Sequence, residues 1–316
     1  MAYYSKQQQQ FGLKKEGTRG TAEATATVWY PVLEAELEYK LNHLQDEALR
    51  GIPDKFAPVP GRKTGTGKIK MNLDPQTSVE MFYSLLGTIS SAQQGGSAAY
   101  KHTITRLVSP TKPVYTFFKD YGISVKNYAT CGVKKVTLAG GVDNLSTLDA
   151  EILFKTEGTG SIGSPAYPTQ RYQGFQHASV KIGGSANVDV KEWSVEIDNG
   201  LIPFQGLALS QDIQDVLAPG KLDIKGSFTA YFTSETERAK FLANTTTTFQ
   251  ILSVGDVAAT TYYYTVDLNL YDIRYTAYPF GEDAGLLAAK VTFDGFYATG
   301  SSKAIQVDIT NVTVSY

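Results

Sequence analysis

The chain has a single cysteine, Cys131, among its 316 residues. Disulfide bonds within the chain are therefore impossible, and zinc sites built from paired cysteines are absent. The sequence opens MAYYSKQQQQFGLKKEG, without the apolar core of a signal peptide, and no apolar run is long enough to cross a membrane. A net charge of −2 gives no basic field that would attract nucleic acid or an anionic membrane. We expect a protein made in a reducing compartment, without membrane contact.

Motifs that carry catalysis or bind metals are also missing. No serine lies in a G-x-S-x-G motif, and Cys131 has no cysteine-enzyme signature around it, so we interpret it as a small buried hydrophobe. The histidines are far apart and none lies in an H-x-x-x-H pattern; they are His43, His102 and His177. We expect no catalytic residue, no metal and no cofactor.

Two glycine-rich stretches resemble nucleotide-binding motifs but fail on inspection. Gly158–Gly163 matches G-x-G-x-x-G, yet the prolines that follow exclude the helix that a dinucleotide site requires. Gly61–Lys68, GRKTGTGK, has the wrong residue at two of the positions that a phosphate-binding loop requires. Its basic residues could touch an anion, but a solvated or intersubunit loop is the better interpretation.

What the sequence does contain favours strands. It has 29 Gly and 20 Tyr with many Thr and Val, and short alternating runs recur between turn signals. Each half contains six or more expected strands, one short helix and one long loop. The predicted fold class is mainly β, with two tandem β-sandwich or β-barrel domains, each flanked by one short α-helix.

One unit occurs twice. Thr66–Leu86 reads as a strand followed by an amphipathic helix, and Lys225–Ala243 repeats this pattern at an offset of 226 − 67 = 159 residues. Each copy holds an S/T-x-x-E capping box, Thr77 with Glu80 and Ser234 with Glu237. We interpret the pattern as a tandem duplication.

This duplication sets the expected domain boundaries. Residues 1–20 form a polar arm that we expect to be flexible unless a partner orders it. The first domain spans 21–157, a linker rich in Gly, Ser and Pro spans 158–173, and the second domain spans 174–316.

The segment Leu33–Leu41, LEAELEYKL, fits two structures. Its apolar residues alternate with charges as in a strand with one wet face, but the same leucines also fit one face of a helix. We choose the strand because its counterpart in the second half, Val188–Asp198, alternates clearly.

Two long connections interrupt the halves at similar places, at Arg50–Gly65 and Gly200–Gly220. The prolines and glycines of the first exclude a core strand or helix. Loops of this length usually bind something or stay disordered, and these carry many apolar groups, so we predict interfaces. The predicted contact residues are Ile52, Phe56, Val59, Arg62, Lys63, Ile202, Phe204, Leu207 and Leu209.

The chain resembles bacteriophage tail tube proteins of long, non-contractile tails. The resemblance lies in FGLKKEGTRGTA (Phe11–Ala22), in the unit at Thr66–Leu86, in YATCGV (Tyr128–Val133) and in Ser179–Leu201, which includes SVKIGG and WSVEIDNGL. It implies β-sandwich or barrel domains whose sheets join between subunits into a ring, usually sixfold. Rings would stack through the long loop and the terminal arm.

The resemblance also implies partners and a location. Two domains per chain would make a ring of three chains with pseudo-sixfold symmetry. DNA would pass through the lumen without specific binding, along a wall poor in basic residues. Tape measure, tail terminator and distal tail proteins would be neighbours in the virion, with assembly in the bacterial cytoplasm.

Other functions stay open at this point. The runner-up is a carbohydrate-binding β-sandwich module such as a virion adhesin, with Tyr262–Tyr264 or Phe117–Phe118 as sugar platforms. A tube of the bacterial contractile-secretion type would share the fold. A hydrolase comes last, because no nucleophile–base pair is visible.

Overall fold

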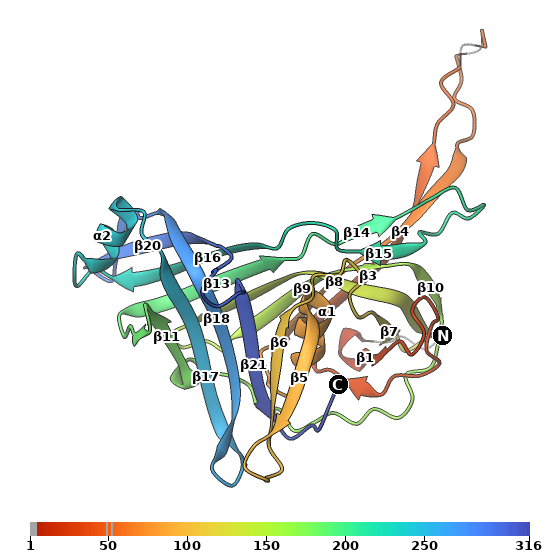
Figure 1. Cartoon of the computed structure of the whole chain (residues 1–316). Coiled ribbons are helices and arrows are strands. Elements are labelled where there is room, and N and C mark those ends of the chain that lie inside the picture. Colours follow the sequence, from red (N-terminus) through yellow and green to blue (C-terminus); the bar gives the residue numbers. More distant parts are fainter. Residues whose placement is uncertain (1–4, 49, 52) are drawn as a thin grey trace.

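The structure is a computed structural model that describes residues 5–48, 50–51 and 53–316. It is mainly β, as predicted, and its strands run antiparallel in layers that cross steeply (Figure 1). The predicted strand at Leu33–Leu41 is confirmed, because it lies within β3.

The largest layer, which we call the long sheet, runs through both halves of the chain. Its strand order is β3-β4-β9-β8-β13-β16-β20, and the far side of β20 pairs with the end of β18 and with β19. The bounds are β3 Val32–Leu44, β4 Val59–Asn72, β9 Thr147–Phe154, β8 Val125–Gly141, β13 Val190–Asp198, β16 Asp223–Tyr231, β20 Leu286–Gly295, β18 Tyr262–Ala277 and β19 Phe280–Asp283.

A second layer, the cross sheet, packs beneath the long sheet (Figure 1). Its order is β5-β6-β21-β18-β17-β11-β12, and β18 is long enough to take part in both layers. The bounds are β5 Gly87–Gln93, β6 Tyr100–Arg106, β21 Ile305–Asn311, β17 Thr247–Ala259, β11 Ala178–Ile182 and β12 Ser185–Ala186. One continuous apolar core lies between the layers and includes residues of both halves.

The N-terminal region forms a third, small sheet instead of a free arm. β1 (Gln10–Lys15) lies between β2 (Val28–Trp29) and β7 (Tyr115–Asp120). β7 also pairs with the start of β8, and that part of β8 pairs on its other side with β10 (Thr156–Thr159). The side chains of Phe11 and Leu13 are 1% exposed. The expectation of a flexible arm is therefore wrong from Gln10 onward, because these apolar side chains complete the core. The short 3-10 helices are η1 Lys6–Gln8 and η2 Phe175–His177.

The predicted linker is also packed. It begins within β10, and its Ile162 and Gln173 are buried. Gln173 donates its backbone N–H to the Leu73 carbonyl at 3.0 Å and accepts from Ser146 N–H at 2.8 Å. The stretch crosses the first half as part of its surface.

The helix α1 (Val79–Leu86) packs between β8 and the β5–β6 hairpin. Its predicted apolar face is confirmed, because its core-facing side chains are fully buried; these are Val79, Phe82, Leu85 and Leu86. The predicted capping box is wrong. Ser78 is the N-cap, without a side-chain cap bond, and the Glu80 carboxylate accepts a hydrogen bond from the Tyr30 hydroxyl at 2.6 Å.

The second helix, α2 (Thr236–Leu242), lies at the far end of the molecule and buries no residue (Figure 1). Its capping box is also wrong, because Glu237 bonds Lys240 and the Tyr275 hydroxyl instead of the helix start. Phe241 stacks on Tyr278, with ring centroids 6.2 Å apart. The predicted sequence of strand and then helix is present in both halves, but only the first helix is part of the core.

The prediction that Arg50–Gly65 is a loop throughout is wrong in its second half. β4 begins at Val59, so the proline and glycines of this stretch lie in a strand. A Cβ atom on Gly65 would stand 2.2 Å from the Phe154 ring of the neighbouring strand β9. Glycine is present here because an aromatic ring lies directly on the backbone, which sequence patterns do not reveal.

Candidate assembly surfaces

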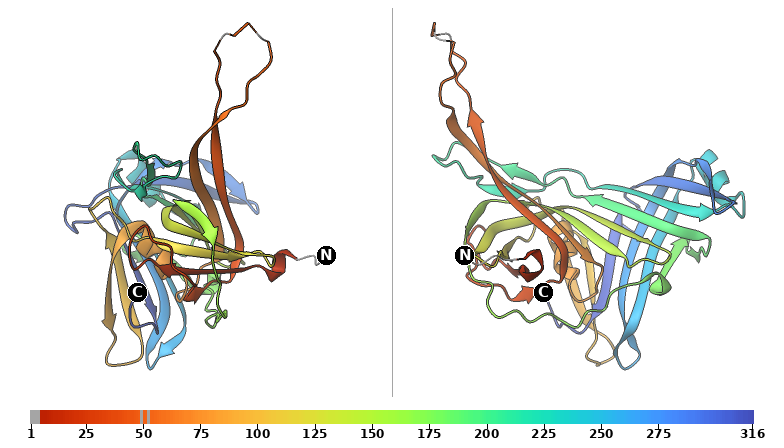
Figure 2. Two further views of the ribbon diagram at one scale, coloured as in Figure 1. Left: turned by 90° about the vertical axis from the view of Figure 1, so that its right-hand side faces the viewer. Right: turned by 180° about the vertical axis from the view of Figure 1, so that it is seen from behind.

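The β3–β4 hairpin rises far above the body of the protein, and the described residues of its tip are 45–48, 50–51 and 53–58 (Figures 1 and 2). Strand pairing reaches up to Leu44 opposite Val59. Beyond it, Arg50 lies over the Phe56 ring at 4.5 Å, and Gln45 donates to the Phe56 carbonyl at 3.0 Å. A hairpin held only at its stem and carrying exposed apolar groups can insert into a neighbouring molecule.

The predicted contact residues on this hairpin divide along its length. Phe56, Val59 and Arg62 are exposed, whereas Ile52 lies outside the described residues. Lys63 is half-buried at the stem, where its ammonium group lies 3.8 Å from the Asp212 carboxylate of the second half. Lys63, which we predicted as a contact to another subunit, thus already has an acidic partner within the chain.

The second long connection, Gly200–Gly220, contains a short hairpin of β14 (Ile202–Phe204) and β15 (Asp215–Leu217). All four predicted contact residues are exposed here, with Leu207 and Leu209 fully so; the others are Ile202 and Phe204. The loop between the strands projects toward the same side as the β3–β4 hairpin (Figure 1).

The structure brings the two predicted loops together at their bases. Lys63 donates its backbone N–H to the Gln211 carbonyl at 2.8 Å, and the Tyr39 hydroxyl bonds Asp212 at 2.5 Å. Their exposed apolar side chains therefore belong to one end of the molecule. Sequence reasoning missed the side chains that anchor the second loop, which form a separate buried cluster of Leu201, Ile213, Val216, Ala218 and Val114.

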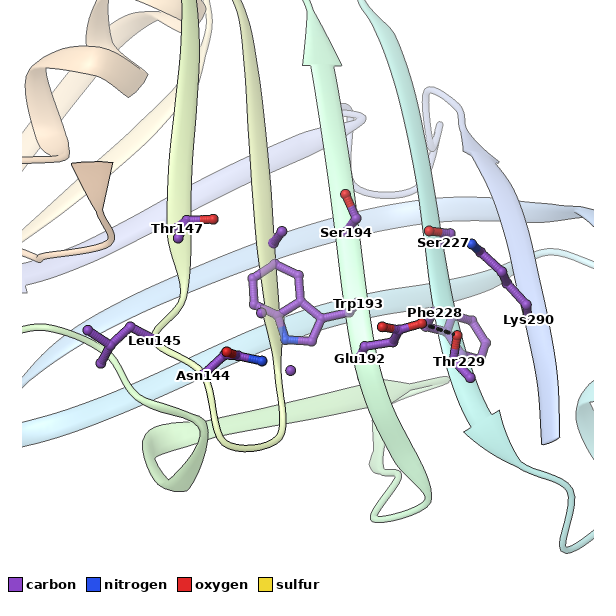
Figure 3. Close-up of a pocket in the computed structure, with 13 residues that line it drawn as sticks. Asn144, Leu145, Thr147, Glu192, Trp193, Ser194, Ser227, Phe228, Thr229 and Lys290 are labelled. Carbon is purple, nitrogen blue, oxygen red and sulfur yellow. Dashed lines mark hydrogen bonds between the residues drawn. The ribbon is translucent and has the colours of Figure 1, made fainter. Parts of the chain in front are cut away.

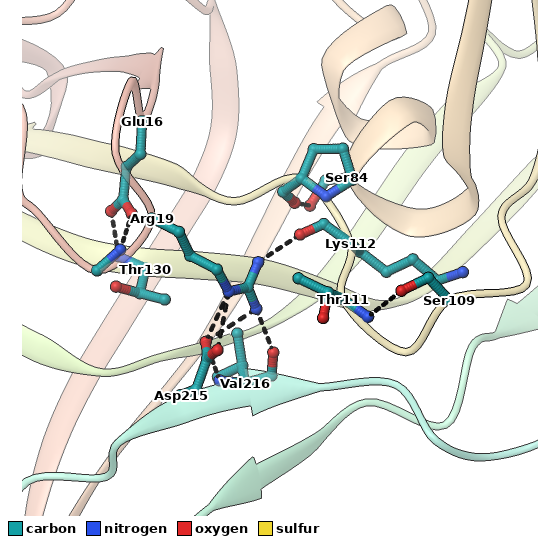
Figure 4. A network of polar contacts seen from close by, with 11 residues as sticks. Glu16, Arg19, Ser84, Ser109, Thr111, Lys112, Thr130, Asp215 and Val216 are labelled. Carbon is teal, nitrogen blue, oxygen red and sulfur yellow. Dashed lines mark hydrogen bonds and ion pairs between the residues drawn. The ribbon is translucent and has the colours of Figure 1, made fainter.

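Arg19 fastens this second loop to the first half (Figure 4). Its guanidinium holds the Asp215 carboxylate at 2.8 Å and donates to the carbonyls of Lys112 at 2.5 Å and Val216 at 2.6 Å. Next to it, buried Glu16 accepts from the backbone N–H groups of Thr130 and Gly20. Burial raises the pKa of Glu16, although these bonds favour its charged form. The planar guanidinium contacts both carboxylate oxygens of Asp215, a bidentate geometry that explains why an arginine serves here.

The outer face of the long sheet is polar and charged. Along β9 and β13, inward apolar residues alternate with outward polar ones. The outward lysines have acidic neighbours: Lys135 lies 2.7 Å from Glu151 and 3.4 Å from Glu196, and Lys68 lies 3.2 Å from Asp149. These contacts raise the pKa of Lys135.

This face is also hollowed. Figure 3 shows one hollow in which Ser194, Ser227 and Lys290 lie on three adjacent strands, and Glu192 accepts from the Thr229 hydroxyl at 2.7 Å. The lining mixes hydroxyl and charged side chains with apolar ones such as Trp193 and Leu145, without convergent polar groups that would fix one small ligand.

A family model described as Phage tail tube protein matches residues 6–305. The chain belongs to the phage tail tube protein family. No curated protein matches it. The match spans both halves and both long connections, from β1 to β20, so the tail tube family covers nearly all of the described fold.

In the part of the chain that the structure describes, no group of three or more potential metal ligands occurs. No described helix is long and apolar enough to span a membrane. Cys131 is buried, and burial raises the pKa of its thiol, which makes it a poor nucleophile.

The residues that resembled other sites have structural roles. Gly61–Lys68 lies in strand β4 and cannot cradle a phosphate. His102 is buried between the Ser91 hydroxyl at 2.8 Å and the Asn311 amide at 3.0 Å. The aromatic pair Phe117–Phe118 is buried in the core, so it offers no platform for a sugar.

Proposed function

We propose that three chains of this tail tube protein close into a ring with pseudo-sixfold symmetry, and that stacked rings form the tube of a long, non-contractile tail. The observation that carries this proposal is the order of the long sheet. β3-β4-β9-β8 of the first half continue directly into β13-β16-β20 and then β18 with β19 of the second half. A sheet that repeats in one direction can extend around a ring.

Matching details support two tandem tube domains. Leu37 lies opposite Gly67 on β3 and β4, and Val195 lies opposite Gly226 on β13 and β16. A Cβ atom on Gly226 would stand 2.2 Å from Phe293, and one on Gly65, two residues before the equivalent Gly67, would stand 2.2 Å from Phe154. Each half thus carries a glycine beneath a phenylalanine of the neighbouring strand, shifted by two residues between the halves. We retain the boundaries 21–157 and 174–316 as the proposed domains, although β8 pairs with β13 across them.

The polar face of the long sheet would line the lumen. Eight strands per chain give 24 in a ring of three, and at about 4.8 Å per strand the circumference is about 115 Å before strand tilt widens it. The other face of the long sheet is covered by the cross sheet and α1. These layers would not fit inside a ring of this circumference, so the covered face would point outward. DNA would therefore pass along the polar face.

The charges on this face suit transit without specific binding. We expected a wall poor in basic residues, but this face carries several lysines. Its lysines are held by carboxylates, as at Lys135 and Lys68, so they are less available to DNA phosphates. Phosphate contacts by free lysines would hold the DNA.

The β3–β4 hairpin and the exposed leucines near Leu207 would join one ring to the next. They project from one end of the molecule, as a contact along the tube axis requires (Figure 2). Contacts that do not close on themselves produce filaments. Tape measure, terminator and distal tail proteins would meet the same tube, after assembly in the host cytoplasm.

Negative-stain microscopy of the purified protein tests this function. We expect tubes or stacked rings at high concentration, with threefold or pseudo-sixfold symmetry in end-on views. Compact monomers alone, at high concentration and under tail-assembly conditions, would overturn the proposal.

A further inference from the structure

The seam between the two halves contains a strand joint whose register is known. β8 and β13 pair with Leu138 opposite Val195. Val142 donates its N–H to the Lys191 carbonyl at 3.0 Å, and Asn199 donates to Lys134 at 3.1 Å. Since hydrogen-bonded pairs alternate along antiparallel strands, Leu138 and Val195 also form such a pair.

The first edge strand of the long sheet, β3, is equivalent to β13 of this joint, but its outer side has no partner strand among the described residues. The register on β4 and β16 places Leu37 of β3 where Val195 lies on β13. Among the described residues, β3 pairs only with β4. Lys119 donates to the Ala35 carbonyl at 2.5 Å, which shows that this backbone group points away from β4.

At the opposite edge of the long sheet, β19 is equivalent to β8 of the joint. Ile152 lies opposite Gly67 and Phe293 opposite Gly226, so β9 and β20 correspond at an offset of 293 − 152 = 141 residues. Leu148 then corresponds to Ala289, and their partners Leu138 and Phe280 correspond as well.

The hydrogen bonding of β19 agrees with this correspondence. Lys290 donates its N–H to the Pro279 carbonyl at 3.1 Å, so Pro279 faces β20 and the next residue, Phe280, presents its backbone groups outward. Among the described residues, β19 pairs only with β20. The side chain of Phe280 packs on Phe232 yet is 45% exposed, whereas Leu138 at the internal seam is 1% exposed.

We propose that β19 of one copy pairs antiparallel with β3 of the next copy, with Phe280 opposite Leu37. This joint rests on the proposed ring and names the strands that close it. It repeats the β8–β13 seam between molecules: outward backbone groups meet outward backbone groups, and both side chains point to the core face. A slip of one residue would turn Phe280 to the polar face, so the register is well specified.

Paired cysteines test the register. The positions next to the central pair, Glu36 and Gly281, would form a non-hydrogen-bonded pair on the polar face, where Cβ atoms come within about 5 Å and a disulfide can form. A Cβ atom on Gly281 meets nothing within 4 Å, and Cys131 is buried and does not interfere. We expect the double variant Glu36→Cys, Gly281→Cys to yield dimers and trimers, and no larger species, on denaturing gels after oxidation of assembled tubes.

The matched control is Glu38→Cys with Gly281→Cys, which is two residues out of register. Its Cβ atoms would stand about 7 Å apart or more, so we expect little cross-linking. Preferential cross-linking of this control, or none by the first variant in tubes that microscopy shows, would overturn the register and leave the tube intact as a proposal. Loss of all rings and tubes in the unmodified protein would instead overturn the proposed function.

A single substitution provides a second readout. Phe280→Asp should leave the β-rich circular dichroism unchanged and abolish rings, because a charge would enter the core face of the joint. Tyr263→Asp, at an aromatic residue of similar exposure (47%) outside this edge, should still form rings. Rings formed by Phe280→Asp would contradict the joint.

Discussion

The two halves carry a long insertion at the same place, between the first two strands of the repeated unit, and the insertions are held differently. The β3–β4 hairpin rises free of the body, and its described residues contact the rest of the chain only at the stem. The β14–β15 hairpin is folded down over a small apolar cluster and clamped by Arg19. Their helices differ as well, since α1 is buried and α2 is exposed.

This comparison indicates a division of labour. The first half supplies the buried helix together with the more extended hairpin. The second half braces the stem of that hairpin through Asp212 and Gln211. Under the proposed duplication, two copies that began alike would be free to diverge in this way once they shared one chain.

The largest effect should come from removing the free insertion. Replacing residues 46–57 with a two-residue Asn-Gly turn shortens the hairpin without touching its paired stem. We expect loss of tubes and retention of single rings, by negative-stain microscopy, with unchanged β-rich circular dichroism. Leu207→Ser with Leu209→Ser, on the clamped insertion, should weaken stacking less. Normal tubes from the shortened variant would refute the stacking role.

The two helices should differ strongly in their contribution to stability. Phe82→Ala removes a fully buried ring from α1 and should lower the free energy of unfolding by about 3–5 kcal/mol. Phe241→Ala on α2 removes a half-buried ring and should cost about 1 kcal/mol. Urea unfolding measures both, and equal losses would mean that α2 is as much part of the core as α1.

The buried Glu80 should make the first half sensitive to pH. Burial raises its pKa from 4.5 to about 7, so the folded protein holds this proton more tightly than the unfolded chain does. The contribution of protonated Glu80 to the free energy of unfolding is complete below about pH 4.5 and is lost as pH rises through 7. Glu80→Gln should remove this loss and be more stable than the wild type at pH 8, by up to about 3 kcal/mol. Exposed Glu38→Gln is the control and should leave the pH dependence of the free energy of unfolding unchanged. If Glu80→Gln lost stability with rising pH as steeply as the wild type, Glu80 would not be the cause of that loss.

A smaller effect is expected at the clamp on the second insertion. Arg19→Ala leaves Asp215 and two carbonyls without their partner and should lower the free energy of unfolding by about 2 kcal/mol. Arg19→Lys should recover only part, because an ammonium group cannot span the same fork. Exposed Arg62→Ala is the matched control and should change the free energy by less than about 0.5 kcal/mol. If Arg19→Ala matched this control, the clamp would not hold the insertion.

Sequence reasoning succeeded where local pattern and packing agree. The alternation in Leu33–Leu41 and the apolar face of α1 both report a buried side that the structure contains. It also found the two insertions and seven exposed side chains on them. It failed where distant residues decide the outcome. Glu80 turns from the helix start toward Tyr30, fifty positions away, and the chain from Gln10 onward is packed because Phe11 fills a gap in the core.

The β8–β13 seam has a consequence for how a tube would begin to grow. Because both strands belong to one chain, this joint forms during folding, at an effective concentration set by the chain between them instead of by the amount of protein in the cell. Half of the joints in the proposed ring are then complete before any two molecules meet. Only three encounters would remain to close the ring, and dilution could slow those three without undoing the others.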